Sequence, residues 1–355
     1  MENIALVVGS TGITGSTLAQ ELVLQGWTTY GLARNPNHNM KGVNPIKADL
    51  LSTESLDEAL KNISPTHIFF TTWMRNDTEE ENIRVNSALV RNLLAVLSLK
   101  KSVRHVALVT GLKHYLGPFE AYANAGSLPE TPLREEQGRL DYPNFYYAQE
   151  DAVYEAAEKD HFTWSIHRPH TVIGYAIGNL MNMGVTLAVY ASICKETGAP
   201  FIWPGSAAQW NGLSDVTDAG VLAKQLIWAA DSESAKNQAF NVTNGDVFRW
   251  KWLWNRIAAY FEIETDGFDT TVRSLEKEMS GKEEVWKNIT EKYGLKKSDL
   301  SKIASAWHTD LDLSRPIEVV TDVSKSRKAG FSVFQSTEDS FINLFKKLKR
   351  EKIIP

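Results

Sequence analysis

Short apolar runs alternate with amphipathic stretches over the first 175 residues of the chain. The apolar runs are bounded by turn residues and predict strands, whereas the stretches between them repeat apolar residues every three or four positions and predict helices. The expected strands are 4–8, 28–32, 45–48, 67–72, 103–109 and 163–168, and the expected helices are 15–24, 53–62, 79–99 and 145–159.

Strands that alternate with helices predict parallel βαβ units, which right-handed crossovers build into a doubly wound α/β sheet of the Rossmann type. After Gly174 the pattern changes, and the elements expected there are a long apolar helix over 181–194, an extended piece at 201–204, a helix over 215–230, a strand at 240–242 and a helical, Trp-rich remainder from Arg249. We therefore expect a Rossmann domain over 1–175, completed by about 205–245. Residues 176–204 and 246–355 would form a smaller, mostly helical lobe that binds the substrate.

Composition narrows the class of protein. With 355 residues and 43% hydrophobic residues the chain can bury a sizeable core, and a net charge of -5 argues against a nucleic-acid partner. One cysteine, Cys194, excludes an intrachain disulfide and a cysteine-based metal site. No apolar run approaches the roughly 20 residues of a membrane span, and the first residues do not resemble a signal peptide. We expect a cytoplasmic protein without a membrane partner. The sequence leaves open whether it forms a homodimer.

A glycine-rich turn, Val8-Gly9-Ser10-Thr11-Gly12-Ile13-Thr14-Gly15, follows the first expected strand and opens a helix. Glycine allows a tight turn and close approach to a pyrophosphate, and the helix start offers free N–H groups to phosphate. The spacing G-x-x-G-x-x-G is typical of extended and atypical short-chain dehydrogenases. We expect a dinucleotide to contact Gly9, Thr11, Gly12, Ile13, Thr14 and Gly15.

The end of the second strand distinguishes the two nicotinamide cofactors. An NAD site usually has an acid there, but this chain has Ala33-Arg34-Asn35, and Arg34 can clamp a 2′-phosphate. We therefore expect NADPH/NADP⁺ rather than NAD, although Arg34 can also be an ordinary surface arginine. Asp49 and Leu50 would lie at the adenine, with a helix cap as the alternative role of Asp49. Thr71, Thr72 and Trp73 end the fourth strand, where the cofactor crosses the sheet.

The catalytic pair of an ordinary short-chain dehydrogenase, Tyr-x-x-x-Lys, is absent from its usual place. At 144–151 both Tyr146 and Tyr147 meet an acid four residues on, and the one match, Tyr293 with Lys297, is far from any expected strand end. A lysine is available after the fifth strand, in Thr110-Gly111-Leu112-Lys113-His114-Tyr115. An ammonium about 4 Å from the oxygen of an ionised tyrosine interacts with it by about 4 kcal/mol at an effective dielectric near 20, which lowers the pKa of the tyrosine. Lys113 and Tyr146 are thus candidates, with a surface lysine and an amphipathic helix face as the ordinary alternatives.

These segments resemble the progesterone 5β-reductase/iridoid synthase family. The matching segments are Thr110 to Tyr115 with Gly117-Pro118-Phe119-Glu120, Asn144-Phe145-Tyr146-Tyr147 with Glu150-Asp151, His167-Arg168-Pro169, Phe240 to Asp246, Gly12 to Gly15 and 190–195. The resemblance covers nearly the whole chain. It implies an atypical short-chain reductase that uses NADPH to reduce activated C=C bonds of enones, with Lys113 and Tyr146 as catalytic residues.

The same resemblance places further residues. Thr110, Gly111, Tyr146, Pro169, Thr171 and Ile173 would contact the cofactor, the backbone of 170–173 meeting the nicotinamide carboxamide. Trp73, Tyr115, Met181, Trp307 and His308 would line the pocket of a small apolar enone. The family often has an aromatic residue after the tryptophan, and His308 is more polar, so the substrate is left open.

Two other functions remain open from the sequence. The same tyrosine could act as general acid or base in direct reduction of C=O or in alcohol oxidation. A Rossmann protein can also bind NADP(H) as a sensor and catalyse nothing, since fold alone does not fix function.

Overall fold

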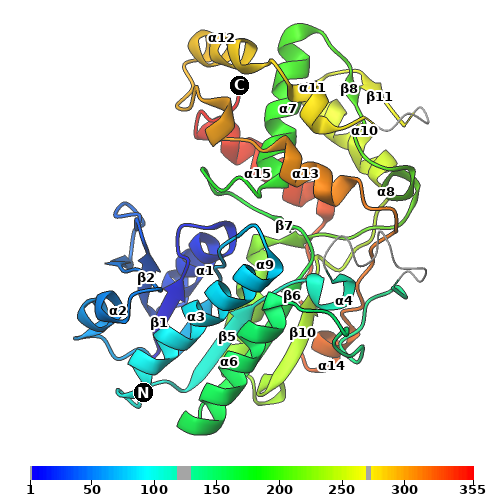
Figure 1. The fold of residues 1–355 in the computed structure, drawn as a ribbon. Coiled ribbons are helices and arrows are strands. Elements are labelled where there is room, and N and C mark those ends of the chain that lie inside the picture. The colour runs from blue at the N-terminus through cyan, green and yellow to red at the C-terminus, as the bar shows by residue number, and fades with distance from the viewer. Residues whose placement is uncertain (1, 118–128, 269–272) are drawn as a thin grey trace. The chain divides into compact units, whose positions relative to one another are not determined.

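The computed structural model describes residues 2–117, 129–268 and 273–355, which form two compact units (Figure 1). The first unit combines Met1–His170, Ala219–Val242 and Thr321–Val333, and the second combines Thr171–Asp218, Thr243–Val320 and Phe334–Pro355. Each unit has its own buried core, and each is described by itself below.

A parallel sheet forms the centre of the first unit. Among the described residues its seven strands run in the order β3-β2-β1-β4-β5-β6-β10. They are β1 (Ile4–Val8), β2 (Thr28–Ala33), β3 (Val43–Lys47), β4 (His67–Phe70), β5 (His105–Val109), β6 (Thr163–Pro169) and β10 (Gln238–Val242). The order reverses between β1 and β4, the point at which such sheets bind ligands beyond the carboxyl ends of their strands. The expected α/β Rossmann fold is confirmed.

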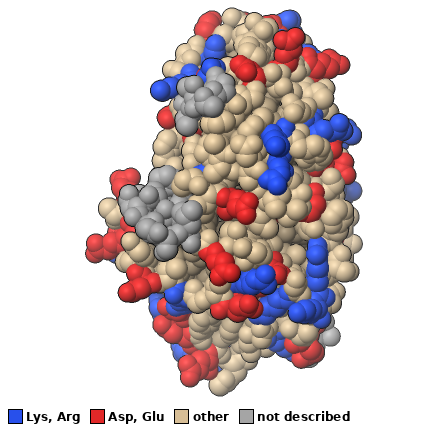
Figure 2. All heavy atoms as spheres, turned by 90° about the vertical axis from the view of Figure 1, so that its right-hand side faces the viewer, with Lys and Arg blue, Asp and Glu red and all other residues tan. Residues whose placement is uncertain are grey.

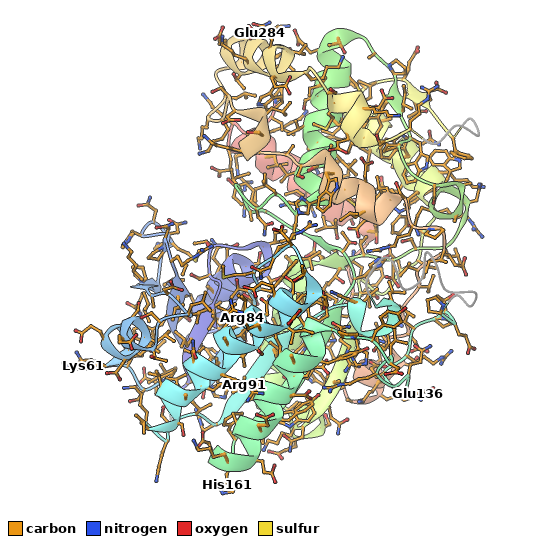
Figure 3. All side chains as sticks on the ribbon, viewed as in Figure 1. Lys61, Arg84, Arg91, Glu136, His161 and Glu284 are labelled. Carbon is orange, nitrogen blue, oxygen red and sulfur yellow. The ribbon has the colours of Figure 1, made fainter. Side chains whose placement is uncertain are left out.

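Helices cover both faces of this sheet, which is why the central strand β1 is apolar on both sides. On one face α3 (Glu79–Ser98) packs against α6 (Phe145–Asp160) and α2 (Thr53–Leu60), and on the other α1 (Ile13–Leu24) packs against α9 (Ala219–Asp231) (Figure 1). Short helices α4 (Lys113–Leu116), η1 (Glu233–Ala235) and α14 (Ser324–Lys328) complete the unit. Helix α6 ends at His161, whose left-handed backbone closes its last turn (Figure 3).

The second unit is mostly helical. Its helices are α7 (Met183–Thr197), α8 (Ala207–Asn211), α10 (Trp250–Phe261), α11 (Leu275–Met279), α12 (Glu283–Tyr293), η2 (Leu300–Lys302), α13 (Ala306–Leu313) and α15 (Thr337–Arg350). Two short parallel pairs accompany them: β7 (Val172–Ile173) with β9 (Thr217–Asp218), and β8 (Phe201–Ile202) with β11 (Thr265–Asp266). Trp254 is fully buried and stacks on Phe201 with ring centroids 3.9 Å apart. Trp250 and Trp254 of α10 thus belong to an ordinary aromatic core, whereas Trp252 is exposed.

Two expectations about chain organisation need correction. The helix expected over 215–230 begins at Ala219, because Thr217 and Asp218 pair with Val172 and Ile173 as strand β9. Residues 205–218 lie in the second unit rather than completing the Rossmann domain, and 321–333 return to the first unit. They return because this stretch covers the edge strand β10, where α14 packs and the Asn241 amide donates to the carbonyl oxygen of Asp322.

The surface carries charges of both signs. On the face shown in Figure 2, basic and acidic side chains are interspersed among the described residues drawn there. Across the described ranges, every helix is too short or too polar to cross a bilayer.

Candidate active site

The glycine-rich turn connects β1 to α1 with the geometry that a phosphate site needs. Gly9 has a positive φ of 86°, and a methyl group on Gly15 would lie 2.2 Å from the Gly9 carbonyl oxygen, so both positions require glycine. At the start of α1, Gly12 provides no capping side chain and the first turn contains no acid. The first N–H groups of α1, at Ile13 and Thr14, therefore face the turn without a side-chain cap, as in helix starts that bind anions.

The end of β4 lies against this turn. The Thr71 hydroxyl donates to the carbonyl oxygen of Val8 at 2.8 Å, and a methyl group on Gly9 would come within 2.7 Å of Thr72 Cβ. Trp73 follows and stacks on Phe145 with ring centroids 5.1 Å apart. Thr71, Thr72 and Trp73 follow β4, which ends at Phe70, and lie between the glycine turn and the start of α6.

The ends of β2 and β3 carry the residues that were expected to distinguish the cofactors. Arg34 and Asn35 are exposed directly after β2. Asp49 Oδ1 accepts the N–H of Leu51 at 3.0 Å, and the cap of α2 is Ser52, which accepts the N–H of Ser55. Asp49 therefore forms a turn and leaves the capping role, its alternative interpretation, to Ser52. Leu50 is buried.

Tyr146 lies at the carboxyl end of the central strands. A methyl group on Gly111 would lie 3.1 Å from the Tyr146 hydroxyl oxygen and 3.5 Å from the carbonyl oxygen of Pro169. The hydroxyl is therefore held over the residues that follow β5 and beside the end of β6. Thr110, just before Gly111, donates its N–H to the carbonyl oxygen of His167 at 2.9 Å, which fixes the two strand ends together.

Lys113 begins the short helix α4 and is tied to the same helix as Tyr146. The Asn144 amide donates to the Lys113 carbonyl oxygen at 2.9 Å, while Asn144 Oδ1 accepts the N–H of Tyr146 at 3.0 Å. The Lys113 ammonium lies 4.8 Å from the centroid of the Phe145 ring and forms an ion pair with Glu79. The structure thus brings the segments of Lys113 and Tyr146 together and adds Glu79, which sequence reasoning missed.

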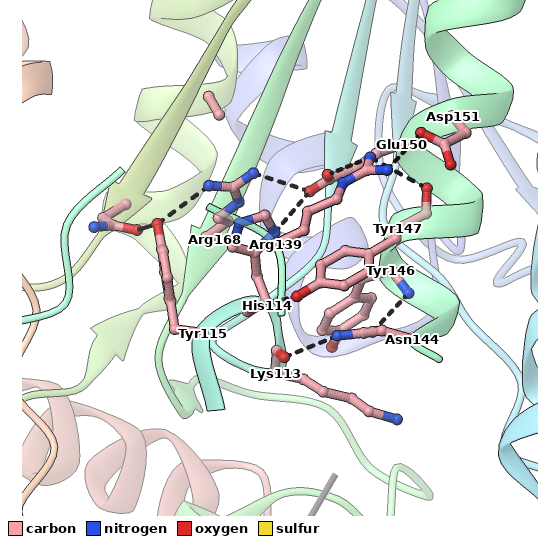
Figure 4. A network of polar contacts seen from close by, with 12 residues as sticks. Lys113, His114, Tyr115, Arg139, Asn144, Tyr146, Tyr147, Glu150, Asp151 and Arg168 are labelled. Carbon is pink, nitrogen blue, oxygen red and sulfur yellow. Dashed lines mark hydrogen bonds and ion pairs between the residues drawn. The ribbon is translucent and has the colours of Figure 1, made fainter. Parts of the chain in front are cut away.

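An ionic network surrounds the buried carboxylate of Glu150 on the same helix (Figure 4). Glu150, four residues after Tyr146, is only 1% exposed in its side chain and accepts from Arg168 at 3.2 Å and from Arg139 at 3.1 Å. Burial raises the pKa of Glu150, but His114 and the two arginines outweigh it and hold the pKa below its ordinary value. The position four residues after Tyr146, where an ordinary short-chain dehydrogenase has its lysine, therefore holds an ionised carboxylate that is paired with arginines. Asp151 pairs with Arg139 as well.

The two other tyrosines of this region hold the α4 turn in place. The Tyr147 hydroxyl donates to the His114 carbonyl oxygen at 2.6 Å, and the Tyr115 hydroxyl donates to Asn241 Oδ1 at 2.6 Å (Figure 4). Burial raises the pKa of Tyr115 to about 12 and raises that of Tyr147, so both stay protonated and act as donors. Tyr115, expected in the substrate pocket, is 4% exposed inside the first unit.

The remaining predicted residues belong to the second unit. The Thr171 hydroxyl donates to Asp312 Oδ2 at 3.0 Å, and the Ile173 side chain is fully buried in β7. Met181 and Trp307 are partly exposed, and His308 Nδ1 lies 2.7 Å from the Ser305 hydroxyl. The roles of these residues stay predictions, and Pro118, Phe119 and Glu120 of the matched motif lie outside the described residues.

The unassigned Tyr293 and Lys297 also lie in the second unit. The Tyr293 hydroxyl donates to Glu196 at the exposed surface, and the carbonyl oxygen of Lys297 accepts the indole N–H of Trp286. The first contact joins α12 to α7, and the second joins α12 to the segment that follows it.

Solved structures share this fold. The UDP-glucose 4-epimerase of Thermotoga maritima superposes with a TM-score of 0.69 over 98% of this chain and 99% of that chain, at 10% identity. That of Thermus thermophilus, solved as a complex with NAD, has a TM-score of 0.67 over 98% and 99% of the two chains, at 14% identity. At these identities the likeness concerns the fold alone.

Sequence relatives are much closer. The 3-oxo-Delta(4,5)-steroid 5-beta-reductase of Arabidopsis thaliana is 39% identical over 100% of this chain and 94% of its own length. An (S)-8-oxocitronellyl enol synthase of Nepeta racemosa is also 39% identical, over the same shares of the two chains. Residues 44–355 match the model of the PRISE-like Rossmann-fold domain. The chain therefore belongs to the PRISE-like Rossmann-fold family.

Proposed function

We propose that this chain is an NADPH-dependent reductase of the C=C bond in α,β-unsaturated carbonyl compounds. The observation that carries the proposal is the Tyr146 hydroxyl above Gly111, at the carboxyl edge of the sheet, on a helix tied to the segment of Lys113. The name of the Arabidopsis relative describes a reductase of a 3-oxo-Delta(4,5)-steroid, which is a conjugated enone. We further propose that the enzyme acts in the cytoplasm on a small apolar enone.

The residues present fit a phosphorylated dinucleotide. Gly9 and Gly15 leave the turn without side chains, and the start of α1 offers N–H groups to a pyrophosphate. Arg34 is exposed after β2, where its guanidinium can bind a 2′-phosphate. NADPH, when bound, supplies the hydride for the β-carbon of the enone.

The chain's own groups then act on the substrate oxygen. As the β-carbon gains a hydride, negative charge builds on the carbonyl oxygen of the enone. The Tyr146 hydroxyl donates a hydrogen bond to that oxygen, and the positive charge of Lys113 stabilises it further. The α-carbon of the resulting enolate takes a proton from solvent, which completes the saturated carbonyl product.

The test is NADPH consumption with a panel of small enones. Tyr146→Phe is expected to lower kcat on the best enone by about 10²–10³-fold, because one donor to the developing oxyanion is lost. Tyr142→Phe, at a residue that is 51% exposed, is the matched control and should keep the wild-type kcat. An unchanged kcat in Tyr146→Phe would contradict the assigned role.

The products and the cofactor are checked in the same assay. NMR of the product distinguishes a saturated ketone from an allylic alcohol, the product of direct C=O reduction. Arg34→Ala is expected to raise KM for NADPH while leaving KM for NADH nearly unchanged, because only NADPH carries the 2′-phosphate. Equal effects on both cofactors would contradict the role of Arg34.

A further inference from the structure

Glu79 contacts Lys113 and the residue directly before Tyr146, although it comes from a third segment of the chain. It is the first residue of α3, and its carboxylate has a separate partner on each oxygen. Oε1 accepts the N–H of Phe145 at 2.8 Å, and Oε2 accepts the Lys113 ammonium at 2.5 Å. One carboxylate therefore joins α3 to the lysine and to the residue directly before Tyr146.

The contact to Phe145 caps the helix that carries Tyr146. The first N–H groups of a helix have no partner within it. In α6 the Asn144 side chain accepts the N–H of Tyr146, and Glu79 accepts the N–H of Phe145. A negative charge at this end also suits the helix dipole. Glu79 thus fixes where α6 begins and, one residue later, the backbone of Tyr146.

The contact to Lys113 restricts a flexible cation. The side chains of Lys113 and Glu79 are 22% and 23% exposed, so the ion pair is partly shielded from water. The ring of Phe145 bounds the ammonium from another direction, at 4.8 Å from its centroid. A lysine side chain that loses its carboxylate partner regains rotamers, and its charge spreads over a larger volume.

We infer that Glu79 is a positioning residue that fixes the Lys113 ammonium and the start of α6, so that charge and phenol face one substrate oxygen. This role rests on the proposed reductase function. Glu79 acts through Lys113 and α6, and no contact of its own with substrate is required. The next two acids have other surroundings. Glu80 is exposed, and Glu81 forms an ion pair with the exposed Arg84 on the outer side of α3.

Glu79→Gln separates the two contacts. The amide oxygen of glutamine can still accept the N–H of Phe145, but its NH₂ group cannot accept from an ammonium. We expect kcat to fall by about ten- to a hundredfold, because a small misplacement of a charged group has effects of this size. KM for NADPH should stay within about twofold, since the loss concerns charge that develops in the transition state. Glu80→Gln is the matched control and should keep the wild-type kcat.

A double-mutant cycle then shows whether Glu79 acts through Lys113. If it does, Glu79→Gln will lower kcat strongly in the wild type and hardly at all in Lys113→Met, so the two effects will not add. Circular dichroism and fluorescence titration with NADPH show that each variant is folded and binds cofactor.

Additive effects in an active wild type would overturn the inference and leave the proposed function standing. A wild type that turns over no enone would overturn the function itself, and the role of Glu79 with it.

Discussion

At the scale of single residues, the missing side chain of Gly111 determines where the Tyr146 hydroxyl can lie. A methyl group there would be 3.1 Å from that oxygen, closer than ordinary van der Waals contact, and 3.5 Å from a backbone carbonyl oxygen that cannot move away easily. Of these two neighbours, the Tyr146 side chain moves more easily than the backbone. Any side chain at this position would therefore displace the hydroxyl from the strand end rather than move the sheet.

Gly111→Ala is expected to lower kcat on the order of tenfold, because the hydroxyl is displaced by tenths of an ångström from its position. The free energy of unfolding should change by less than about 1 kcal/mol, since a side chain can relax there. Steady-state kinetics and urea unfolding measure the two quantities. Gly138→Ala is the control, as that glycine is exposed and a methyl group on it meets nothing within 4 Å. Equal kcat values for both variants would contradict the argument.

The candidate pair could be named from sequence, but its supports could not. Lys113 and Tyr146 lie in local motifs directly after expected elements. Glu79 stands among three consecutive acids at a helix start, a pattern that the helix dipole alone explains. Its importance depends on contacts with residues 34 and 66 positions away, which no local pattern encodes.

At the scale of elements, α6 is fixed to the sheet by charges as well as by apolar packing. Glu150 on α6 meets Arg168 on β6, and both side chains are buried, at 1% and 5% exposure. Removing one member of such a pair leaves the other charge buried without its counter-ion. The outer side of α6 carries a different kind of pair, which Glu155 forms with Arg91 of α3 (labelled in Figure 3), and both side chains are exposed.

Glu150→Ala is expected to lower the free energy of unfolding by about 3–5 kcal/mol at pH 7, because Arg168 is left uncompensated in the interior. Urea unfolding followed by circular dichroism measures the change. Glu155→Ala, on the same helix, is the control and should change stability little, since water screens its pair. Unfolding of both variants at the same urea concentration would show that the buried pair stabilises the protein no more than the exposed one.

Element prediction failed where tertiary pairing overrode the local pattern. The stretch from Asp215 to Asp218 continues the helix-like pattern of α9, yet two of its residues join a strand pair with β7. Propensity over four residues is too weak to decide between these states. The expected helix was therefore right in kind and began four residues too early.

At the scale of the whole molecule, alternation of strands and helices was enough to predict the first unit. It could not predict that residues 321–333 return to that unit, because α14 is too short to show a helical period and the rest of the segment is largely irregular. The face of the sheet beneath α9 holds another feature that periodicity does not show. The buried His67, His105 and His167 lie on neighbouring strands β4, β5 and β6.

The Ser165 hydroxyl links two of these histidines by hydrogen bonds. Ser165 Oγ lies 2.9 Å from Nε2 of His105 and 2.9 Å from Nε2 of His167. His167 Nδ1 lies 2.8 Å from Gln225 Oε1 on α9. Burial lowers the pKa of His67 to about 4, that of His105 to about 3 and that of His167 to about 4. All three rings are neutral in the folded protein at pH 7.

The unfolded chain binds protons at these histidines near pH 6.5, whereas the folded protein does not. The free energy of unfolding therefore has its full value above pH 6.5 as far as these three groups are concerned, and it decreases as the pH falls from 6.5 toward 4. Each histidine contributes up to about 1.4 kcal/mol per pH unit, and the three together at most about 4 kcal/mol per pH unit. Urea unfolding should show stability falling as the pH is lowered from 7.5 to 5, and His114, whose pKa is also lowered by burial, adds to the slope. His67→Phe should reduce the slope by the share of one histidine, because phenylalanine keeps the packing against Trp27 but binds no proton. Identical slopes in the variant and the wild type would show that His67 takes up no proton on unfolding.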